Sequence, residues 1–131
     1  MEAIASGDID MQYCRDFNEM IAHRAGLQCF MPLWKQDRRA LLNELFSKGY
    51  QCVICCVTNG VLSPELLGKT LDWDVIKEIE KSGADICGEQ GEYHSMVLNG
   101  RIFKTPVAIE FGDIKYLRGC SLLLADAVKN A

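Results

Sequence analysis

The order of apolar segments in the first half of the chain is the feature that most constrains its fold. Residues 27–34 are mostly apolar and contain Pro32, which marks a strand end because proline cannot donate to a ladder. Residues 37–48 carry one apolar helical face and are followed by Gly49, and an apolar strand is predicted at 51–57. Strand, helix and strand in this order predict a βαβ unit with parallel pairing and a right-handed crossover.

Further helices are predicted on either side of this unit. Apolar side chains three and four residues apart predict a helix over residues 10–25, with a short strand or loop at 3–9 before it. Ser63, followed by proline and glutamate, predicts the capped start of a short helix. Asp72 or Asp74 is expected to cap another helix. The front of the chain is therefore α/β.

The back of the chain is predicted to be mostly β. Residues 93–98 alternate in polarity, and Asn99-Gly100 predicts a two-residue hairpin turn. Residues 107–111 continue with period two, and Gly112-Asp113 predicts another turn. Residues 120–128 fit strand or helix, and we favour a strand because it follows a series of strands.

The sequence GEQGEYHS, residues 88–95, precedes this β region. Glu89 and Glu92, with His94 two positions further on, can serve as acid/base groups, as metal ligands or as a cradle for a cationic substrate. Gly88 and Gly91 allow sharp turns or a close approach to a ligand. The alternative is a solvated turn, which is commoner in an arbitrary sequence. In a parallel sheet ligands would also gather at strand ends, here residues 32–34 and 57–60.

Composition excludes several classes of function. A chain of 131 residues with 49% hydrophobic residues can build one domain with a core. A net charge of -4 and scattered basic residues disfavour binding to nucleic acid or to an anionic membrane. The N-terminus has neither the basic start nor the apolar core of a signal peptide, so we expect a cytoplasmic protein.

The cysteines predict reduced, buried thiols rather than a disulfide framework, because the 7 cysteines are odd in number and lie mainly among apolar residues. Cys52 and Cys55 match a CxxC pattern. They lie on a predicted strand, where side chains three apart point to opposite faces. We therefore expect no metal site at this pair.

The acidic loop and its flanks resemble the signature of the diphthine-ammonia ligase family of PP-loop ATP pyrophosphatases. That signature is usually written GENGEFHT or GEGGEYET followed by D-G-P-x-F, and here residues 99–103 read NGRIF. Gln90, Ser95 and Arg101 depart from the usual residues. Other segments agree in order: Gly7-Asp8-Ile9, Arg15, Glu19, Gly26-Leu27, Pro32-Leu33-Trp34, Leu41-Leu42, Gly49, Leu67-Gly68-Lys69 and Leu71-Asp72.

The resemblance implies a fold and a reaction. Family members open with an SGGKDS phosphate loop and form amides by adenylating a carboxylate before ammonia attacks it. These 131 residues contain no such loop, so ATP and Mg²⁺ are expected in the complete enzyme and not on this chain alone. Residues 1–34 are interpreted as the remnant of a parallel HUP-like nucleotide-binding sheet, and residues 35–131 as a smaller α+β substrate-side domain.

The resemblance also assigns the site. It makes Glu89, Glu92 and His94 the catalytic candidates, because a carboxylate can capture ammonium and remove its proton. The substrate-binding candidates are Gly88, Gly91, Tyr93, Ser95 and Trp34. Diphthine carries a quaternary ammonium, which carboxylates beside the rings of Tyr93 or Trp34 could hold. Packing by Trp34 and solvation of the glutamates are the structural alternatives.

Two functions stay open at this point. The first is the substrate-binding half of an ATP-dependent amide-forming ligase, inactive alone. The alternative is a non-catalytic binding or assembly module that has lost the nucleotide site. The expected partners are a second copy, bound through residues 27–33 or 10–25, or a separate chain supplying the ATP-binding half. The expected substrate is either a protein resembling elongation factor 2 or a small carboxylate.

Overall fold

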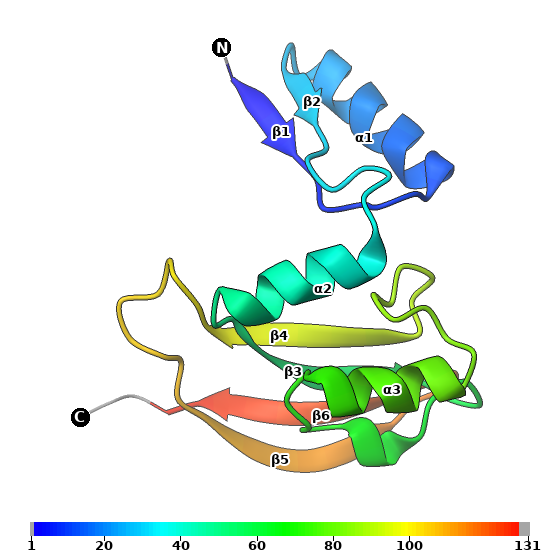
Figure 1. The fold of residues 1–131 in the computed structure, drawn as a ribbon, viewed down its shortest axis with the longest axis vertical. Helices are drawn as coiled ribbons and strands as arrows, with labels where there is room; N and C mark the ends of the chain where they lie inside the picture. Colours follow the sequence, from blue (N-terminus) through cyan, green and yellow to red (C-terminus); the bar gives the residue numbers. More distant parts are fainter. Residues whose placement is uncertain (1, 129–131) are drawn as a thin grey trace. The chain divides into compact units, whose positions relative to one another are not determined.

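The protein divides into two compact units, with the boundary between Leu41 and Leu42. We describe them from a computed structural model, which covers residues 2–128 (Figure 1). The fold is mixed α/β, with one two-stranded parallel sheet and one four-stranded antiparallel sheet.

The first unit is a small βαβ motif. Strand β1 (Ala3–Ala5) leads into helix α1 (Gln12–Arg24) and strand β2 (Gln28–Phe30), which pairs parallel with β1. The helix ends where Gly26 adopts φ 69°, a conformation that glycine reaches without a Cβ penalty.

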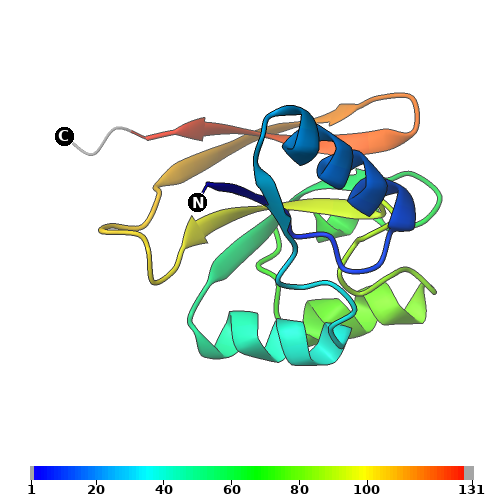
Figure 2. The same ribbon diagram turned by 90° about the horizontal axis from the view of Figure 1, so that it is seen from above.

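The second unit contains the antiparallel sheet, with strand order β4-β3-β6-β5. Helix α2 (Arg38–Ser47) spans the boundary and leads into β3 (Gln51–Thr58). The following elements are η1 (Pro64–Leu66), α3 (Trp73–Lys81), β4 (Tyr93–Asn99), β5 (Ile109–Tyr116) and β6 (Cys120–Ala127). Helices α2 and α3 lie on one side of this sheet (Figure 1 and Figure 2).

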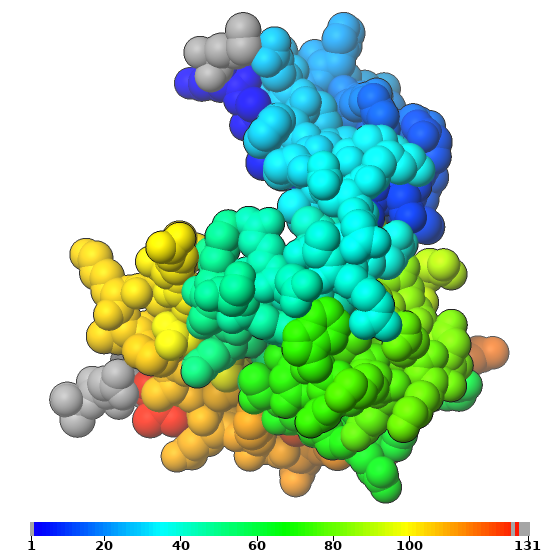
Figure 3. Space-filling model, viewed as in Figure 1, coloured from blue at the N-terminus to red at the C-terminus, as the bar shows by residue number. Residues whose placement is uncertain are grey.

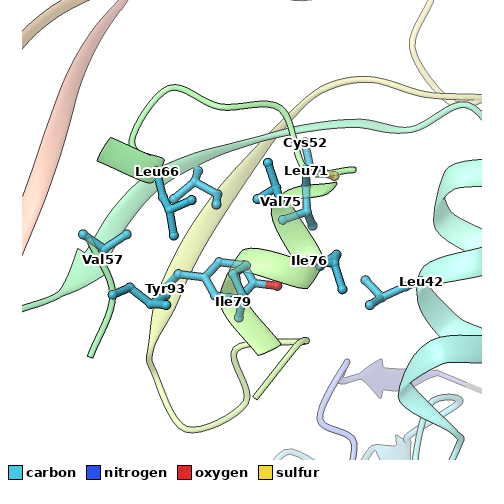
Figure 4. Close-up of a cluster of buried hydrophobic side chains, with 11 residues drawn as sticks. Leu42, Cys52, Val57, Leu66, Leu71, Val75, Ile76, Ile79 and Tyr93 are labelled. Carbon is cyan, nitrogen blue, oxygen red and sulfur yellow. The ribbon is translucent and has the colours of Figure 1, made fainter. Parts of the chain in front are cut away.

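The core of the second unit lies between the sheet and helix α3. Asp72 caps α3 by accepting hydrogen bonds from the backbone N–H groups of Asp74 and Val75, both at 2.9 Å. The apolar stripe of α3 then packs against β3, and Ile54, Val57, Ile76 and Ile79 are fully buried. Figure 4 shows this cluster, with Tyr93 among its members.

The predicted parallel pairing between residues 27–34 and 51–57 is wrong. Strand β2 pairs with β1 in one sheet, whereas β3 pairs antiparallel with β4 and β6 in another. Leu42, Leu45 and Phe46 belong to the core of the second unit, so α2 packs on the antiparallel sheet instead of crossing over between parallel strands. The βαβ unit exists, but it lies one strand earlier.

Two predicted turns are also wrong. The hairpin at Asn99-Gly100 does not form, because β4 and β5 lie at opposite edges of the sheet. Gly112-Asp113 lies inside β5 as an irregularity in its pairing with β6. The chain reverses instead after β5, where the Leu117 N–H donates to the Cys120 carbonyl at 2.9 Å.

Other predictions are confirmed. The helices over residues 10–25 and 37–48 form, Ser63 accepts the N–H of Glu65 as a cap, and residues 120–127 form a strand. All 7 cysteines are free thiols, but Cys52 alone is buried and the other six are partly exposed, so their predicted burial is wrong. Within residues 2–128, no helix has the length and apolarity needed to cross a membrane.

Candidate functional site

Residues 82–92, between α3 and β4, form the acidic loop. This loop is attached to the end of β3. The backbone N–H of Thr58 donates to the Glu92 carbonyl at 2.9 Å, and the Thr58 hydroxyl donates to the Gly91 carbonyl at 2.7 Å. Tyr93 and His94 then pair with Val57 and Cys56. The last strand residues of β3 therefore determine where the loop lies.

Glu92 holds the loop together from inside. Its side chain is largely buried, with the residue 9% exposed. One carboxylate oxygen accepts the N–H of Asp85 at 3.0 Å and the other accepts the N–H of Gln90 at 3.0 Å. Hydrogen bonds to an ionised group are stronger than neutral ones. The Glu92 side chain therefore connects the backbone at Asp85 with the backbone at Gln90.

Tyr93 is the second internal anchor of the loop. Its ring is buried in the core, and its hydroxyl donates to the Ile86 carbonyl at 2.8 Å. Gly88 packs against this ring with φ 69°, and a Cβ at Gly88 would lie 3.0 Å from it. Burial raises the pKa of the Tyr93 phenol well above its ordinary value. The phenol therefore stays protonated and acts as a donor.

We expect Tyr93→Phe to lower the free energy of unfolding by about 1–2 kcal/mol at neutral pH, because it leaves the Ile86 carbonyl without a partner. Above the ordinary tyrosine pKa of 10.0 the unfolded chain loses the proton first. Wild-type stability should then fall by about 1.4 kcal/mol per pH unit relative to the variant. Urea titrations of both proteins from pH 7 to 11 measure this difference.

The matched control is Tyr116→Phe, at a residue that is 70% exposed, and it should change the free energy of unfolding at neutral pH by less than about 0.5 kcal/mol. A wild-type advantage that stays constant across pH 10 would contradict burial of the Tyr93 phenol.

The remaining candidates of the motif lie nearer to solvent. Glu89 is half-buried, and His94 and Ser95 are exposed. His94 lies opposite Cys56, on the face of the sheet away from Tyr93, as the strand alternation predicts. Ser95 lies opposite the buried Ile54 on the same face as Tyr93. Whether Glu89, Glu92 and His94 act in catalysis stays a prediction.

Trp34 lies in the first unit and not in the acidic loop. The Arg15 guanidinium and the Lys35 ammonium each lie 5.1 Å from the centroid of its ring. Both distances are within the range of a cation–π interaction. The ring that was expected to hold a cationic substrate therefore already contacts two cations of the protein itself.

The sequence named residues 57–60 only as a strand end where ligands would gather, and it assigned no role to the side chains of Thr58 and Asn59. The Asn59 amide donates to the Leu117 carbonyl at 3.3 Å, and the fully buried Ser121 hydroxyl donates to the Asn59 side-chain oxygen at 2.7 Å. Together with Thr58, they connect β3 to the acidic loop on one side and to β6 on the other. The position of residues 57–60 after an apolar strand was the available signal, although the sheet is antiparallel rather than parallel.

The described residues form no all-protein cage for a metal ion, and whether this chain binds ATP with Mg²⁺ stays a prediction. Across residues 2–128, no group of three or more histidine, cysteine, aspartate or glutamate side chains lies close enough to hold a metal ion. The loop carries the carboxylates of Asp85, Glu89 and Glu92, which would repel a phosphate chain.

Fold and site define a class of protein, namely a mixed α/β chain in which a glycine-rich acidic loop is anchored at the end of an antiparallel sheet. A sequence model described as the diphthamide synthase C-terminal domain matches residues 37–126, which include the whole loop. The chain belongs to this family.

Full-length relatives agree with this assignment. The chain is 32% identical to the diphthine–ammonia ligase of Homo sapiens, covering 99% of this chain and 54% of that protein. It is 32% identical to the Bos taurus protein of the same name, covering 98% of this chain and 54% of the relative. With the Danio rerio protein the identity is 33%, over 84% of this chain and 45% of the relative. The chain thus spans about half the length of these relatives.

Proposed function

We propose that this chain is the substrate-side part of an ATP-dependent amide-forming ligase. The observation that carries the proposal is that the family match over residues 37–126 includes the loop held by Glu92 and Tyr93. The relatives that match along nearly the whole chain are named diphthine–ammonia ligases. A role connected with diphthamide synthesis follows from that likeness.

The reaction has two steps with different needs. A substrate carboxylate displaces pyrophosphate from ATP to form an acyl-adenylate, and ammonia then attacks the acyl carbon while AMP leaves. Ammonia exists mainly as ammonium at neutral pH, so a base must take one proton before or during attack. Glu89 is the candidate base, since Glu92 accepts two backbone N–H groups inside the loop. His94 is a second candidate base, on the face of β4 away from Tyr93.

The charge of the loop supports a cationic substrate. Asp85 and Glu89 are both partly exposed in this loop, and their carboxylates attract a quaternary ammonium or an ammonium ion. We infer that the substrate carries such a group, as a protein bearing diphthine would. A small carboxylate with an attached ammonium group fits the same chemistry.

The first unit supports an ATP-binding partner. A parallel strand pair with one helix is normally part of a larger sheet covered on both faces. The α1 side chains of Tyr13 and Phe17 are 72% and 53% exposed, and Met20 and Ile21 continue the same stripe. We propose that the first unit is the edge of a HUP-like sheet and that α1 packs against an ATP-binding half, supplied by the same polypeptide or by another chain.

In the assembled enzyme, with the SGGKDS-bearing half present, Glu89→Gln is expected to reduce the rate of amide formation by roughly 100-fold, the scale of general base catalysis. Mass spectrometry of the amide product, alongside pyrophosphate release, measures both steps. Because the proposed base acts after adenylation, pyrophosphate release in the absence of ammonia should change little.

The matched control is Glu65→Gln, which removes an exposed carboxylate on η1 and should leave both rates unchanged. Equal amide formation by wild type and Glu89→Gln would exclude Glu89 as the base.

One observation favours a second candidate function, a non-catalytic assembly module. Glu92, Tyr93 and Gly88 make contacts within the loop, and the Trp34 ring contacts Arg15 and Lys35. A module would leave the rate of the assembled enzyme unchanged in Glu89→Gln and in His94→Ala alike. A ligase domain would lose activity in at least one of them.

A further inference from the structure

Strand β5 is a free edge of the antiparallel sheet. Within residues 2–128, β5 pairs with β6 on one side and with no strand on the other. Every residue from Glu110 to Tyr116 is exposed. The space-filling view shows β5, in orange, along the margin of the second unit beside the helices (Figure 3). At the other edge, the Val107 N–H already donates to the Leu98 carbonyl of β4 at 2.7 Å.

An irregularity in the pairing of β5 with β6 changes which β5 side chains share a face of the sheet. Phe111 lies opposite Ala125 and Ile114 opposite Leu123, and Ala125 and Leu123 share one face of β6. Phe111 and Ile114, three residues apart, therefore share a face, because the irregularity between them adds one residue. By the same pairing Glu110 and Lys115, opposite Asp126 and Leu122, lie together on the other face.

This arrangement is complementary to itself. In an antiparallel pair, directly opposed residues share a face of the sheet. If two β5 strands meet with the twofold axis between Gly112 and Asp113, Glu110 lies opposite Lys115 of the second copy. Phe111 then lies opposite Ile114. Each pair occurs twice in the dimer, and its two side chains lie on the same face of the joined sheet. In a regular strand, residues three or five apart would point to opposite faces, so these pairs could not form.

We propose that two copies of this chain associate antiparallel through β5, joining their two four-stranded sheets into one continuous sheet. The charges select this partner. Charged side chains on an edge strand normally deter pairing, and here the opposite signs of Glu110 and Lys115 make the second copy the favoured neighbour. The paired Phe111 and Ile114 side chains cover apolar surface that is exposed in the single chain.

A strand pair of this length buries less surface than a standard interface of about 1,600 Å². The dimer is therefore weak and depends on concentration. This interface is separate from the α1 stripe, so it does not depend on the proposed function.

Sedimentation equilibrium of the full chain over a range of concentrations tests the proposal. Glu110→Lys and Lys115→Glu each convert both charge pairs to like-charge pairs and should weaken the dimer roughly tenfold. An equimolar mixture of the two variants restores both attractive pairs in the mixed dimer and should regain wild-type affinity. The double variant should regain it as well, with an unchanged net charge.

The control Lys81→Glu makes the same change in net charge as Lys115→Glu on the exposed surface of α3 and should dimerise as wild type does. Circular dichroism confirms that each variant is folded. A wild-type chain that stays monomeric at all concentrations overturns the proposal. So does a dimer that either charge reversal leaves unchanged, or a variant mixture that dimerises no better than its components.

Discussion

Replacing Glu92 with alanine is expected to lower the free energy of unfolding of the second unit by about 3–6 kcal/mol. The substitution removes the acceptor of the Asp85 and Gln90 N–H groups, and each hydrogen bond to an ionised group contributes about 1.5–3 kcal/mol. Urea denaturation followed by Trp73 fluorescence in a Trp34→Phe background reports on this unit, because Trp73 packs edge-on against Phe46 at 5.3 Å.

The comparison variant is Glu89→Ala, which removes a carboxylate from the same loop. It should cost less stability than Glu92→Ala, because Glu89 is less buried than Glu92, while still abolishing most amide formation by the assembled enzyme. Equal loss of stability in both variants would contradict the division of the loop into a structural carboxylate and a chemical one.

Ile76→Ala is expected to cost about 2–5 kcal/mol, the range measured for removing large aliphatic side chains from cores. Ile76 is 0% exposed and lies in the cluster between α3 and the sheet (Figure 4). The cavity has little room to collapse, since neighbouring Ile54, Val57 and Ile79 are also fully buried. The same fluorescence-detected urea titration measures the change.

The control is Ile102→Ala in the same unit, where the side chain is 82% exposed and the expected change is within about 0.5 kcal/mol. If Ile76→Ala and Ile102→Ala shift the transition equally, the α3 cluster is not the core that stabilises this unit.

Local patterns in the sequence were sufficient for the helices. Helices α1 and α2 lie close to the predicted ranges, and α3 begins at a predicted cap, because caps such as Asp72 and stops such as Gly26 and Gly49 act within a few residues of the chain. The alternation around His94 also came from local polarity, whereas the strand at residues 120–127 was favoured because it follows other predicted strands. Local patterns did not predict which strands pair, since pairing joins residues far apart in the sequence.

For the site, too, local sequence was informative and long-range contacts could not be predicted. The sequence located the acidic loop and named its chemical groups. It did not distinguish Glu89 from Glu92, because the difference lies in which carboxylate turns inward to accept the N–H groups of Asp85 and Gln90. It also did not connect Thr58 with Gly91, which are 33 residues apart.

By itself the sequence determined the family of this protein, its helices and the composition of its acidic loop, because each depends on residue identity and short-range spacing. The tertiary structure alone decided that β3 pairs with β4 and β6, that Gly112-Asp113 is an irregularity inside β5, and that Glu92 and Tyr93 point inward. These features depend on which distant segments bury their apolar faces together, and that choice is made by packing of the whole unit rather than by any one stretch of chain.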